Sequence, residues 1–331
     1  MSADILAALT AACNKHFQTD CLISDLKCLT GGASAETWKF DCSVKGEALP
    51  CILRRSAVQA SGQFGVALTK RQEAETIQAV NQYTIPAPKV HFILQDSDGL
   101  GEGYIMQRME GETIPRKILR DEVFAPAREN LTEQCAKALA QLHAISVAEI
   151  PALPDLAPEK QIPQLEGLYR AFNQPSAVFE LSFRWLQANA PKHSRNTLVH
   201  GDFRTGNLLV NPQGLVGILD WELSHLGDPM EDLGWLCVNS WRFGSPLPVG
   251  GFGSRDAFYA AYEKYSGVAV NPADVHFWEV FGTLKWGVIC LFQVFTHLNG
   301  LKRSVELAAI GRRVSETEYD LLNLLEAPPC R

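Results

Sequence analysis

Polar side chains suited to catalysis are concentrated in one short stretch, LVHGDFRTGNLLVNPQGLVGILDWE, residues 198–222. Asp202 precedes Asn207 by five positions, and Asp220 ends the apolar run that follows. Transfer of a phosphoryl group from a magnesium–nucleotide needs a carboxylate to accept the proton of the attacking hydroxyl, and hard oxygen ligands to hold the metal. The types and spacing of the three residues fit both needs. An ordinary β-hairpin with polar ends is the alternative.

The same chemistry needs groups that hold the phosphates, and the sequence places candidates for them upstream. The run CILRR in the third predicted strand supplies Arg54, and Glu73 on the following helix can pair with it. The turn TGGAS between the first two predicted strands has backbone amides that can cover phosphates, although a plain hairpin turn is the alternative. The residues of that turn are Gly31, Gly32, Ala33 and Ser34.

The elements that must position these residues form two parts. Residues 22–109 predict three strands, a helix at 66–83 that ends before the two prolines of TIPAP, and two further strands, KVHFIL and GEGYIMQRM. Beyond residue 115 helical patterns dominate, and strand signals lie only around 198–220. The sequence therefore predicts an α+β fold. The predicted helices of the second part are 127–147, 162–173, 177–190, 230–241, 254–266, 272–296 and 301–325.

Composition narrows the function classes. The chain has 331 residues, which suits two lobes, and its formal net charge of −7 argues against nucleic acid as a partner. Nine scattered cysteines without a CxxC pair argue against zinc and favour a reducing, cytoplasmic location. The run MSADILAALTAACNKHF has an amphipathic helix pattern rather than that of a signal peptide.

The most apolar segment, residues 277–295, contains Glu279 and Lys285. Its uncharged part is short for a bilayer, so we expect a buried helix and no membrane span. A homodimer is compatible with the chain, but no pattern in it determines the oligomeric state.

Three strings, LVHGDFRTGNLLV, GILDWELSHLGDPMEDLGWL and IMQRMEGE, resemble the aminoglycoside phosphotransferase and choline kinase-like superfamily. Here HGDFRTGN stands where protein kinases have HRDLxxxN, and ILDWE stands where they have DFG. The strings GDPMEDLGWLCVNSWRFG, FGTLKWGV and GRRVSETEYDLL resemble, more narrowly, the phosphotransferase group related to kinase domains fused to acyl-CoA dehydrogenases. The resemblance covers about residues 20 to 325.

This resemblance implies a bilobal protein-kinase-like fold. A five-stranded antiparallel sheet would lie in an N-lobe at residues 1–105, followed by a hinge at 106–111 and a mainly helical C-lobe at 112–331. ATP would lie between the lobes, with its adenine against the backbone from Gln107 to Met109.

In the implied active site Asp202 is the catalytic base, Asn207 and Asp220 hold Mg²⁺, and Arg54, paired to Glu73, meets the α- and β-phosphates. The superfamily usually has lysine on the third strand, whereas this chain and the narrower group have arginine. Arginine is a larger, planar donor with bidentate geometry, so it can pair differently with phosphates and with glutamate.

Neighbouring residues each have two interpretations. Asp232 either braces the catalytic loop or is an ordinary first-turn carboxylate, and we favour His200 as a brace over a general base. Arg204 faces either solvent or the transferred phosphoryl group. Glu222 either contacts metal through water or substrate, or is a solvated strand end. Trp241 either belongs to the core or lines an acceptor pocket beside the glycine- and proline-rich loop that follows it.

Two further motifs have structural interpretations. Asp228, Pro229 and Glu231 fit the N-cap, N1 and N3 positions of a capping box, so we expect them to start a helix. We expect His143, in QLHAI, to pack on a helix face.

The sequence therefore predicts an ATP- and Mg²⁺-dependent small-molecule kinase that phosphorylates a hydroxyl group. The narrower resemblance points to a hydroxyacyl compound or its CoA thioester, with Arg242, Arg312 and Arg313 as candidate partners of anionic groups. An aminoglycoside- or choline-type acceptor is the alternative within the class. A catalytically silent nucleotide-binding scaffold is an alternative from another class, motivated by Arg54. A protein kinase is a weaker third, because ELSHLGDP leads directly into a helix without an activation segment.

Overall fold

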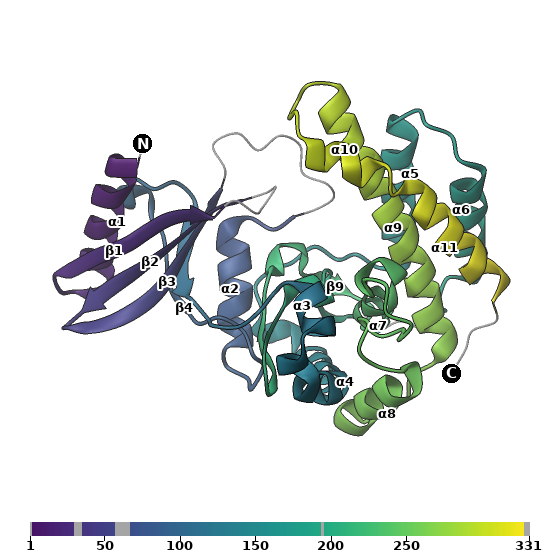
Figure 1. Ribbon diagram of the computed structural model, residues 1–331, viewed down its shortest axis with the longest axis horizontal. Helices are drawn as coiled ribbons and strands as arrows, with labels where there is room; N and C mark the ends of the chain where they lie inside the picture. The colour runs from purple at the N-terminus through teal and green to yellow at the C-terminus, as the bar shows by residue number, and fades with distance from the viewer. Residues whose placement is uncertain (1, 30–34, 57–66, 193–194, 328–331) are drawn as a thin grey trace.

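The computed structural model describes residues 2–29, 35–56, 67–192 and 195–327. Figure 1 shows a β-rich lobe at the end that carries the N-terminus and a larger, helical lobe at the other end. Helix α2 (Lys70–Val80) lies between them. The predicted α+β, bilobal architecture is confirmed.

The N-terminal lobe is built on one five-stranded antiparallel sheet, as predicted. Lys45 and Gly46 have positive φ values of 54° and 85°, which close the tight hairpin between its second and third strands. In space the strands follow the order β1-β2-β3-β5-β4. Their bounds are β1 Cys21–Leu29, β2 Ala35–Val44, β3 Glu47–Ser56, β4 Val90–Ile93 and β5 Gly103–Gln107.

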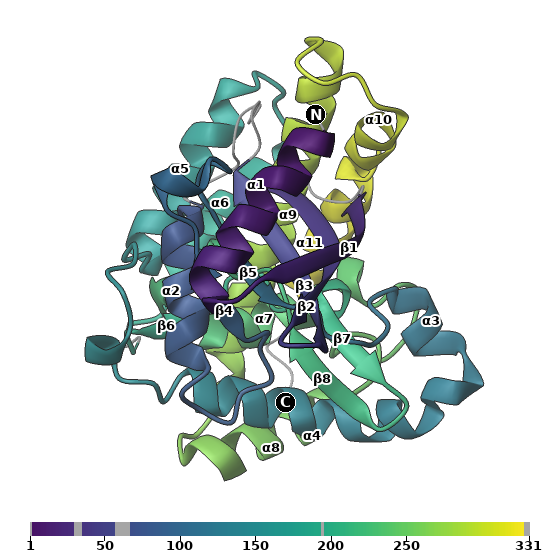
Figure 2. The same cartoon turned by 90° about the vertical axis from the view of Figure 1, so that its left-hand side faces the viewer.

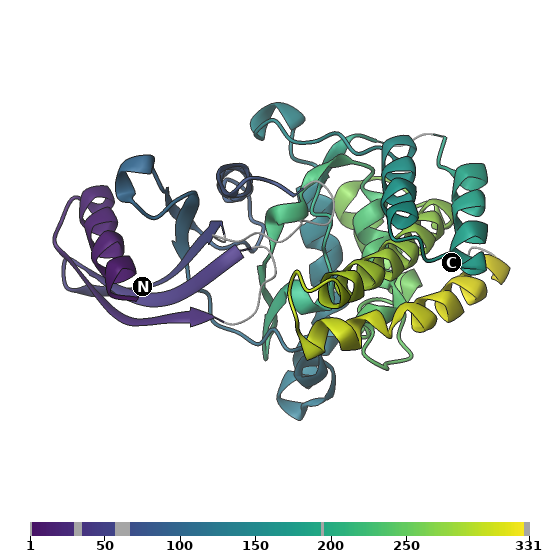
Figure 3. The same cartoon turned by 90° about the horizontal axis from the view of Figure 1, so that it is seen from above.

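Helix α1 (Ser2–Phe17) covers one face of this sheet, as Figure 3 shows from above. The amphipathic pattern predicted this helix, and its apolar stripe forms a separate small core with the sheet. The residues at its centre are Ile5, Leu9, Ala12, Cys13, Phe40, Leu53, Phe92 and Ile105.

Helix α2 begins four residues later than the predicted start at 66, with a capping box. Thr69 Oγ1 accepts from the backbone N–H of Gln72 at 3.1 Å, and Gln72 Oε1 accepts from the backbone N–H of Thr69 at 3.2 Å. The buried side of the helix packs into the large core of the protein through Ala74, Ile77 and Val80. Glu73 lies on this buried side, so the helix holds its carboxylate inside the protein.

The C-terminal lobe consists of helices around two small β-ladders. Strand β6 (Thr197–Val199) pairs with β9 (His225–Gly227), and β7 (Leu208–Asn211) pairs with β8 (Gly214–Ile218). Figure 2 shows the β7–β8 hairpin beside α3 and α4. The helices are α3 Pro115–Arg120, α4 Ala125–Leu142, α5 Pro158–Ala171, α6 Ala177–Asn189, α7 Met230–Cys237, α8 Arg255–Ser266, α9 Pro272–Leu298, α10 Val305–Gly311 and α11 Val314–Glu326.

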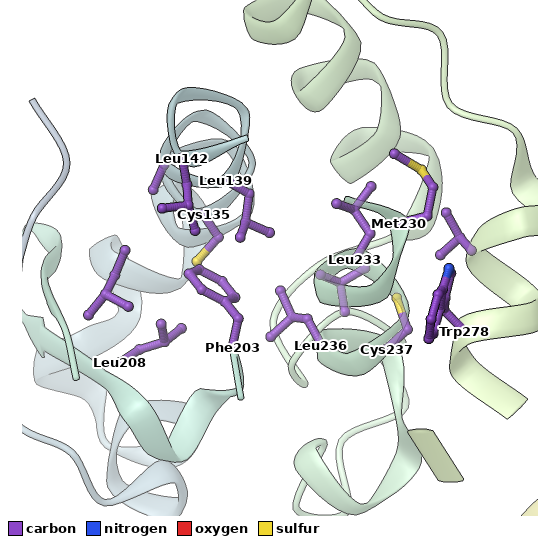
Figure 4. Packing of buried hydrophobic residues seen from close by; sticks show 14 of the residues in the cluster. Cys135, Leu139, Leu142, Phe203, Leu208, Met230, Leu233, Leu236, Cys237 and Trp278 are labelled. Atoms are coloured by element: carbon purple, nitrogen blue, oxygen red, sulfur yellow. The ribbon is translucent and has the colours of Figure 1, made fainter. Parts of the chain in front are cut away.

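The core of this lobe fixes the segment that follows β6. Phe203 is fully buried, and Figure 4 shows its ring pointing toward Cys135 and Leu139 of α4. Leu233 and Leu236 of α7 belong to the same core. The aromatic anchor therefore sets the position of the residues on either side of it.

Helix α9 is long and apolar enough, by length and composition, to cross a membrane. Half of its most apolar 18-residue window is buried inside the protein, where the helix packs against α7, α10 and α11. Glu279 on this helix is buried with Arg242 and Arg255 at 2.8 and 2.7 Å. The prediction of a buried helix is confirmed.

Two helix predictions were wrong in detail. The single helix predicted at 301–325 is two helices, α10 and α11, separated at Arg312 and Arg313. The capping box predicted around Asp228 is not formed as expected. Asp228 Oδ1 does accept from the backbone N–H of Met230 at 3.0 Å, but Glu231 Oε2 lies 3.0 Å from His225 Nε2 instead of reaching back.

Candidate active site

The catalytic loop, residues 200–207, connects β6 to β7 and presents Asp202 in a fixed orientation. Asn207 Nδ2 donates to Asp202 Oδ2 at 2.6 Å, and Trp235 Nε1 donates to Asp202 Oδ1 at 2.9 Å. Arg204 Nε donates to the same Oδ1 at 3.0 Å. These donors hold the carboxylate while 13% of its side chain stays exposed, which leaves it accessible to a small hydroxyl.

The β7–β8 hairpin brings the two predicted metal ligands to one end. Leu208 pairs with Ile218, and the backbone N–H of Leu219 donates to the carbonyl of Asn207 at 2.9 Å. Asp220 follows directly, in the left-handed region with φ 67° and ψ 65°, where the chain turns out of β8. Asn207 and Asp220 therefore lie side by side although 13 positions separate them.

The donor atoms at this end suit a magnesium ion. Because Asn207 Nδ2 is held by Asp202, the amide oxygen is the atom that can face a cation. The Asp220 side chain is 33% exposed and supplies a carboxylate. Across the described ranges no group of three or more His, Cys, Asp or Glu side chains forms a metal cluster. Mg²⁺ typically takes one or two protein carboxylates and completes its shell with phosphate and water, so two oxygen ligands fit it.

Arg54 lies across from this loop on β3, and the structure contains its predicted pairing with Glu73. Arg54 Nε is 2.9 Å from Glu73 Oε1, although its N–H is not aligned as a hydrogen bond. Arg54 Nη2 donates to Asp220 Oδ1 at 2.6 Å and to Glu222 Oε2 at 2.8 Å. The guanidinium thus joins three carboxylates, and Glu222 is an ion-pair partner rather than a solvated strand end.

Sequence reasoning missed two members of this cluster. Lys70 is 3% exposed, and its Nζ donates to Glu73 Oε2 at 2.6 Å. Tyr104 on β5 is 1% exposed and donates its hydroxyl to Glu73 Oε1 at 2.9 Å. The spacing of Lys70 and Glu73, three positions apart at a helix start, is the only signal in the sequence, and it is typical of exposed helix pairs.

The protonation states in the cluster follow from burial and from its charges. Burial alone would lower the pKa of Arg54, but the Glu73 and Asp220 carboxylates raise it well above its usual value. Burial and the Glu73 carboxylate raise the pKa of Tyr104 well above its usual value, so its hydroxyl remains a donor. Burial would raise the pKa of Asp220, but the Arg54 guanidinium lowers it, so this carboxylate is ionised.

Asp232 braces the catalytic loop, which was one of its two predicted interpretations. The side chain is fully buried and accepts from the backbone N–H of His200 at 2.8 Å and from that of Gly201 at 3.0 Å. His143 Nε2 lies 3.1 Å from its Oδ2, and His143 Nδ1 lies 2.9 Å from the Tyr262 hydroxyl. His143 is buried against Tyr262 of α8, as expected of a residue that packs on a helix face, and its ring in addition holds the brace in place.

The geometry supports His200 as a structural residue. Its Nδ1 accepts from the backbone N–H of Asp202 at 3.2 Å, and its ring centroid is 4.6 Å from that of Trp221. Burial lowers the pKa of His200 despite the neighbouring carboxylates, so the imidazole is neutral. A neutral, fully buried ring that supports the loop backbone is poorly placed to take a proton from substrate.

A cluster of three tryptophans lies beside Asp202. Trp241 is 4% exposed, and its ring centroid is 5.2 Å from that of Trp235 and 5.0 Å from that of Trp286. The guanidinium carbon of Arg204 lies 4.9 Å from the centroid of Trp241. Arg204 is thus held between Asp202 and an indole ring, and Trp241 belongs both to a small core and to the neighbourhood of the catalytic loop.

The predicted adenine-binding segment has some of its backbone donors in use. The N–H of Gln107 donates to the carbonyl of Lys89 at 2.8 Å, and that of Arg108 donates to the carbonyl of Pro50 at 2.9 Å. Met109 and the carbonyls of this segment remain the candidates for contact with a base. Four other predicted phosphate-binding residues lie outside the described residues: Gly31, Gly32, Ala33 and Ser34.

The oriented carboxylate of Asp202, the side-chain oxygens of Asn207 and Asp220 beside it and the buried Arg54 opposite them lie between a β-lobe and a helical lobe, an arrangement that suits phosphoryl transfer. Residues 25–278 match the phosphotransferase enzyme family, and the chain belongs to that family. It is therefore a phosphotransferase that acts on a hydroxyl group, and the predicted class is confirmed.

Solved structures with the same fold include phosphotransferases of several kinds. One from Ralstonia eutropha, described as a candidate aminoglycoside phosphotransferase, has a TM-score of 0.73 at 20% identity, with 96% of this chain and 97% of that chain covered. A choline/ethanolamine kinase family protein from Mesorhizobium loti has a TM-score of 0.62 at 18% identity, with 92% and 89% covered. A streptomycin–ATP ternary complex of an aminoglycoside phosphotransferase, APH(2")-IIa, has a TM-score of 0.59 at 17% identity, with 88% and 90% covered. At these identities the likeness concerns the fold, and it confirms the predicted kinase-like architecture.

Curated relatives with similar sequence are longer proteins. Mouse acyl-CoA dehydrogenase family member 10 is 29% identical over 198 residues, which is 56% of this chain and 18% of the relative. Human acyl-CoA dehydrogenase family member 11 is 27% identical over 175 residues, which is 49% of this chain and 22% of the relative. The match thus spans about a fifth of the relatives' length. It confirms the predicted link to the dehydrogenase-associated group.

Proposed function

We propose that this protein is an ATP- and Mg²⁺-dependent kinase that transfers the γ-phosphoryl group to a hydroxyl of a hydroxyacyl compound or of its CoA thioester. The observation that carries the proposal is the arrangement of Asp202, Asn207 and Asp220 at one end of the β7–β8 hairpin, with Arg54 bonded to Asp220 from the other lobe at 2.6 Å. The eight cysteines of the described residues are free thiols, which fits the reducing cytoplasm that we propose as its location.

In this proposal Asp202 accepts the proton of the attacking hydroxyl. Its orientation is set before substrate arrives by Asn207 and Trp235, so little reorganisation is needed during the reaction. Asn207 and Asp220 would hold Mg²⁺, which when bound neutralises charge on the phosphate oxygens. Arg54 would offer its planar guanidinium to the phosphates while Glu73 keeps it in place.

The charges beside the tryptophan cluster support an anionic acceptor. Lys285 Nζ lies 5.1 Å from the centroid of Trp235, and the Arg313 guanidinium carbon lies 5.5 Å from the centroid of Trp286. With Arg204 on Trp241, three cations adjoin the three rings. An acceptor that carries a carboxylate or phosphate suits this environment better than a polycation does.

The acidic side chains near the tryptophan cluster already have basic partners. Glu279 is paired with Arg242 and Arg255, which also removes Arg242 from the residues expected to meet an anionic substrate. Glu231 is paired with His225 at 3.0 Å and lies 3.8 Å from Lys285. Arg313, 33% exposed, is also paired, with Glu316 at 2.9 Å, but that carboxylate is 58% exposed, so the guanidinium remains a candidate for the anionic group. The names of the dehydrogenase relatives give the acyl character of the proposed acceptor.

The test is ATP turnover, with and without Mg²⁺, against hydroxyacyl compounds and their CoA thioesters, choline and aminoglycosides. We expect turnover only with Mg²⁺ and with the acyl acceptors. Asp202→Asn is expected to lower kcat by at least ~100-fold with little change in ADP affinity, whereas the exposed carboxylate variant Asp256→Asn is expected to match the native chain.

Three results would contradict the proposal in different ways. Turnover of choline or an aminoglycoside in place of the acyl compounds would transfer the function to that acceptor class. Nucleotide binding without phosphorylation of any acceptor would favour a catalytically silent scaffold. Full activity of Asp202→Asn would remove the assigned base.

A further inference from the structure

Lys70 is a buried cation that neither the predicted catalytic set nor the family match assigns. Its side chain is 3% exposed, and its ammonium donates to Glu73 Oε2 at 2.6 Å and to Glu222 Oε2 at 3.2 Å. The next residue of α2, Arg71, is 57% exposed and lies 3.7 Å from Glu75. The burial of Lys70 is thus specific to its position.

Lys70 and Arg54 share their carboxylate partners. Each contacts a different oxygen of Glu73, and both contact Oε2 of Glu222. Arg54 Nη2 also contacts Asp220. Among the residues that the structure describes, two cations therefore contact three carboxylates, which gives these five side chains a net charge of −1 in a largely buried cluster.

A backbone hydrogen bond fixes this arrangement across the two lobes. The N–H of Leu68, just before α2, donates to the carbonyl of Glu222 at 2.8 Å. Because Lys70 starts the helix directly afterwards, its ammonium is held beside the turn Trp221–Leu223, 3.2 Å from Glu222 Oε2. Glu222 thereby joins α2 to the segment that carries the proposed metal ligand.

We propose that Lys70 is a positioning residue for Arg54 at the nucleotide phosphates, an inference that rests on the proposed function. Lys70 keeps Glu73 and Glu222 compensated, so Arg54 can exchange its bond to Asp220 for a bond to phosphate without leaving buried carboxylates unpaired. The two cations have separate roles, since Lys70 holds the carboxylates and Arg54 meets the ligand.

This division of roles predicts how nucleotide affinity depends on the net charge of the cluster and on the presence of Mg²⁺. Without Lys70 the described side chains of the cluster carry a net charge of −2, Arg54 is the one described cation in contact with the three carboxylates, and the added negative charge repels phosphate. The loss falls most heavily on nucleotide without metal, because a divalent cation offsets the excess negative charge. A purely structural role would weaken binding with and without metal equally.

The experiment compares ADP affinity, by isothermal titration calorimetry, in EDTA and in excess Mg²⁺. We expect Lys70→Met to weaken metal-free ADP binding on the order of tenfold, and Mg²⁺–ADP binding by less. The matched control is Arg71→Met, which changes a neighbouring exposed cation and is expected to leave both affinities unchanged.

Removing the shared carboxylate supplies a second test. Glu222→Gln brings the net charge to zero and is expected not to weaken metal-free ADP binding. The double variant Lys70→Met/Glu222→Gln restores a net charge of −1 and is expected to bind metal-free ADP within about threefold of the native chain. If Lys70→Met alone fails to fold, a folded double variant with this affinity supports the inference.

Other outcomes would overturn it. Equal losses with and without metal in folded Lys70→Met would show a structural role only. A double variant that does not fold, or that binds metal-free ADP as weakly as Lys70→Met, would refute the charge argument. If the native chain binds ADP in neither condition, the proposed function itself fails, whereas native binding without the expected pattern refutes only the role of Lys70.

Discussion

Replacing Asp232 with asparagine tests whether one buried carboxylate holds the catalytic loop. Asp232 accepts from two backbone N–H groups, those of His200 and Gly201 at 2.8 and 3.0 Å, and from His143 at 3.1 Å. Asparagine has nearly the same shape but only one acceptor oxygen, so its amide NH₂ must face one of these donors. An unsatisfied buried donor costs ~1–3 kcal/mol, and the loss of charge weakens the remaining bonds. We expect Asp232→Asn to lower the free energy of unfolding by about 3 kcal/mol, or the thermal midpoint by roughly 6 °C or more.

The assay is thermal unfolding followed by circular dichroism, with Asp256→Asn as the control. Asp256 is an exposed carboxylate in the first turn of α8, where the helix dipole accounts for about 0.3–1 kcal/mol. If both variants lose the same small amount, Asp232 is an ordinary first-turn carboxylate and the bracing argument is refuted. Gly201 gives the loop little freedom to adjust, since its φ is 78° and an added Cβ would lie 2.4 Å from the Leu223 carbonyl oxygen.

Three further perturbations probe the lobe core, the cation on β3 and a buried ion pair. Burial opposes ionisation of His225, but its carboxylate partner Glu231 raises the pKa of the imidazole above its usual value. The pair therefore stabilises the fold fully below about pH 6.5, the pKa of an unfolded histidine. This stabilisation is lost as pH rises through the higher pKa of His225 in the folded protein. The stability gap between the native chain and His225→Gln should accordingly narrow as pH rises above about 6.5 in urea titrations, and a gap independent of pH would contradict this. Gly234→Ala places a Cβ 2.6 Å from Cβ of Trp278, so we expect a loss of ~1–3 kcal/mol by chemical denaturation, whereas Gly167→Ala, in open space, should cost nothing. Arg54→Lys cannot reach all three carboxylates at once, so the nucleotide-free thermal midpoint should fall by roughly 3 °C or more, and an unchanged midpoint would show that one ammonium suffices.

The sequence predicts those parts of the fold that depend on local periodicity. The strand–strand–strand–helix–strand–strand order of the first lobe and most helices of the second follow from apolar spacing and from proline stops. The sequence could also identify three candidate site residues, because a five-residue loop and a short hairpin fix their separation. These residues are Asp202, Asn207 and Asp220. The helix break at Arg312 and Arg313 escaped prediction because helical periodicity continues on both sides of it.

What the sequence did not predict depends on contacts between distant segments. Lys70 resembles an exposed helix-start lysine until Glu222, 152 positions later, is brought against it. Glu231 has the spacing of a capping box, but its carboxylate is buried against His225 at 3.0 Å and Gln161 at 2.6 Å, and the local pattern that suggests a capping box contains neither contact. His143 likewise gains its role only because Asp232 is folded against it.

Two different physical effects hold the proposed catalytic groups. The brace centred on Asp232 binds backbone N–H groups of the loop and is fully buried, so it acts on geometry and should influence stability more than ligand charge. The cluster of Arg54 and Lys70 with its carboxylates retains a net negative charge and partial exposure at Asp220, so it responds to the charge of what binds. Substitutions in the brace should therefore change the unfolding temperature at every Mg²⁺ concentration, whereas those in the cluster should change the effect of Mg²⁺ itself.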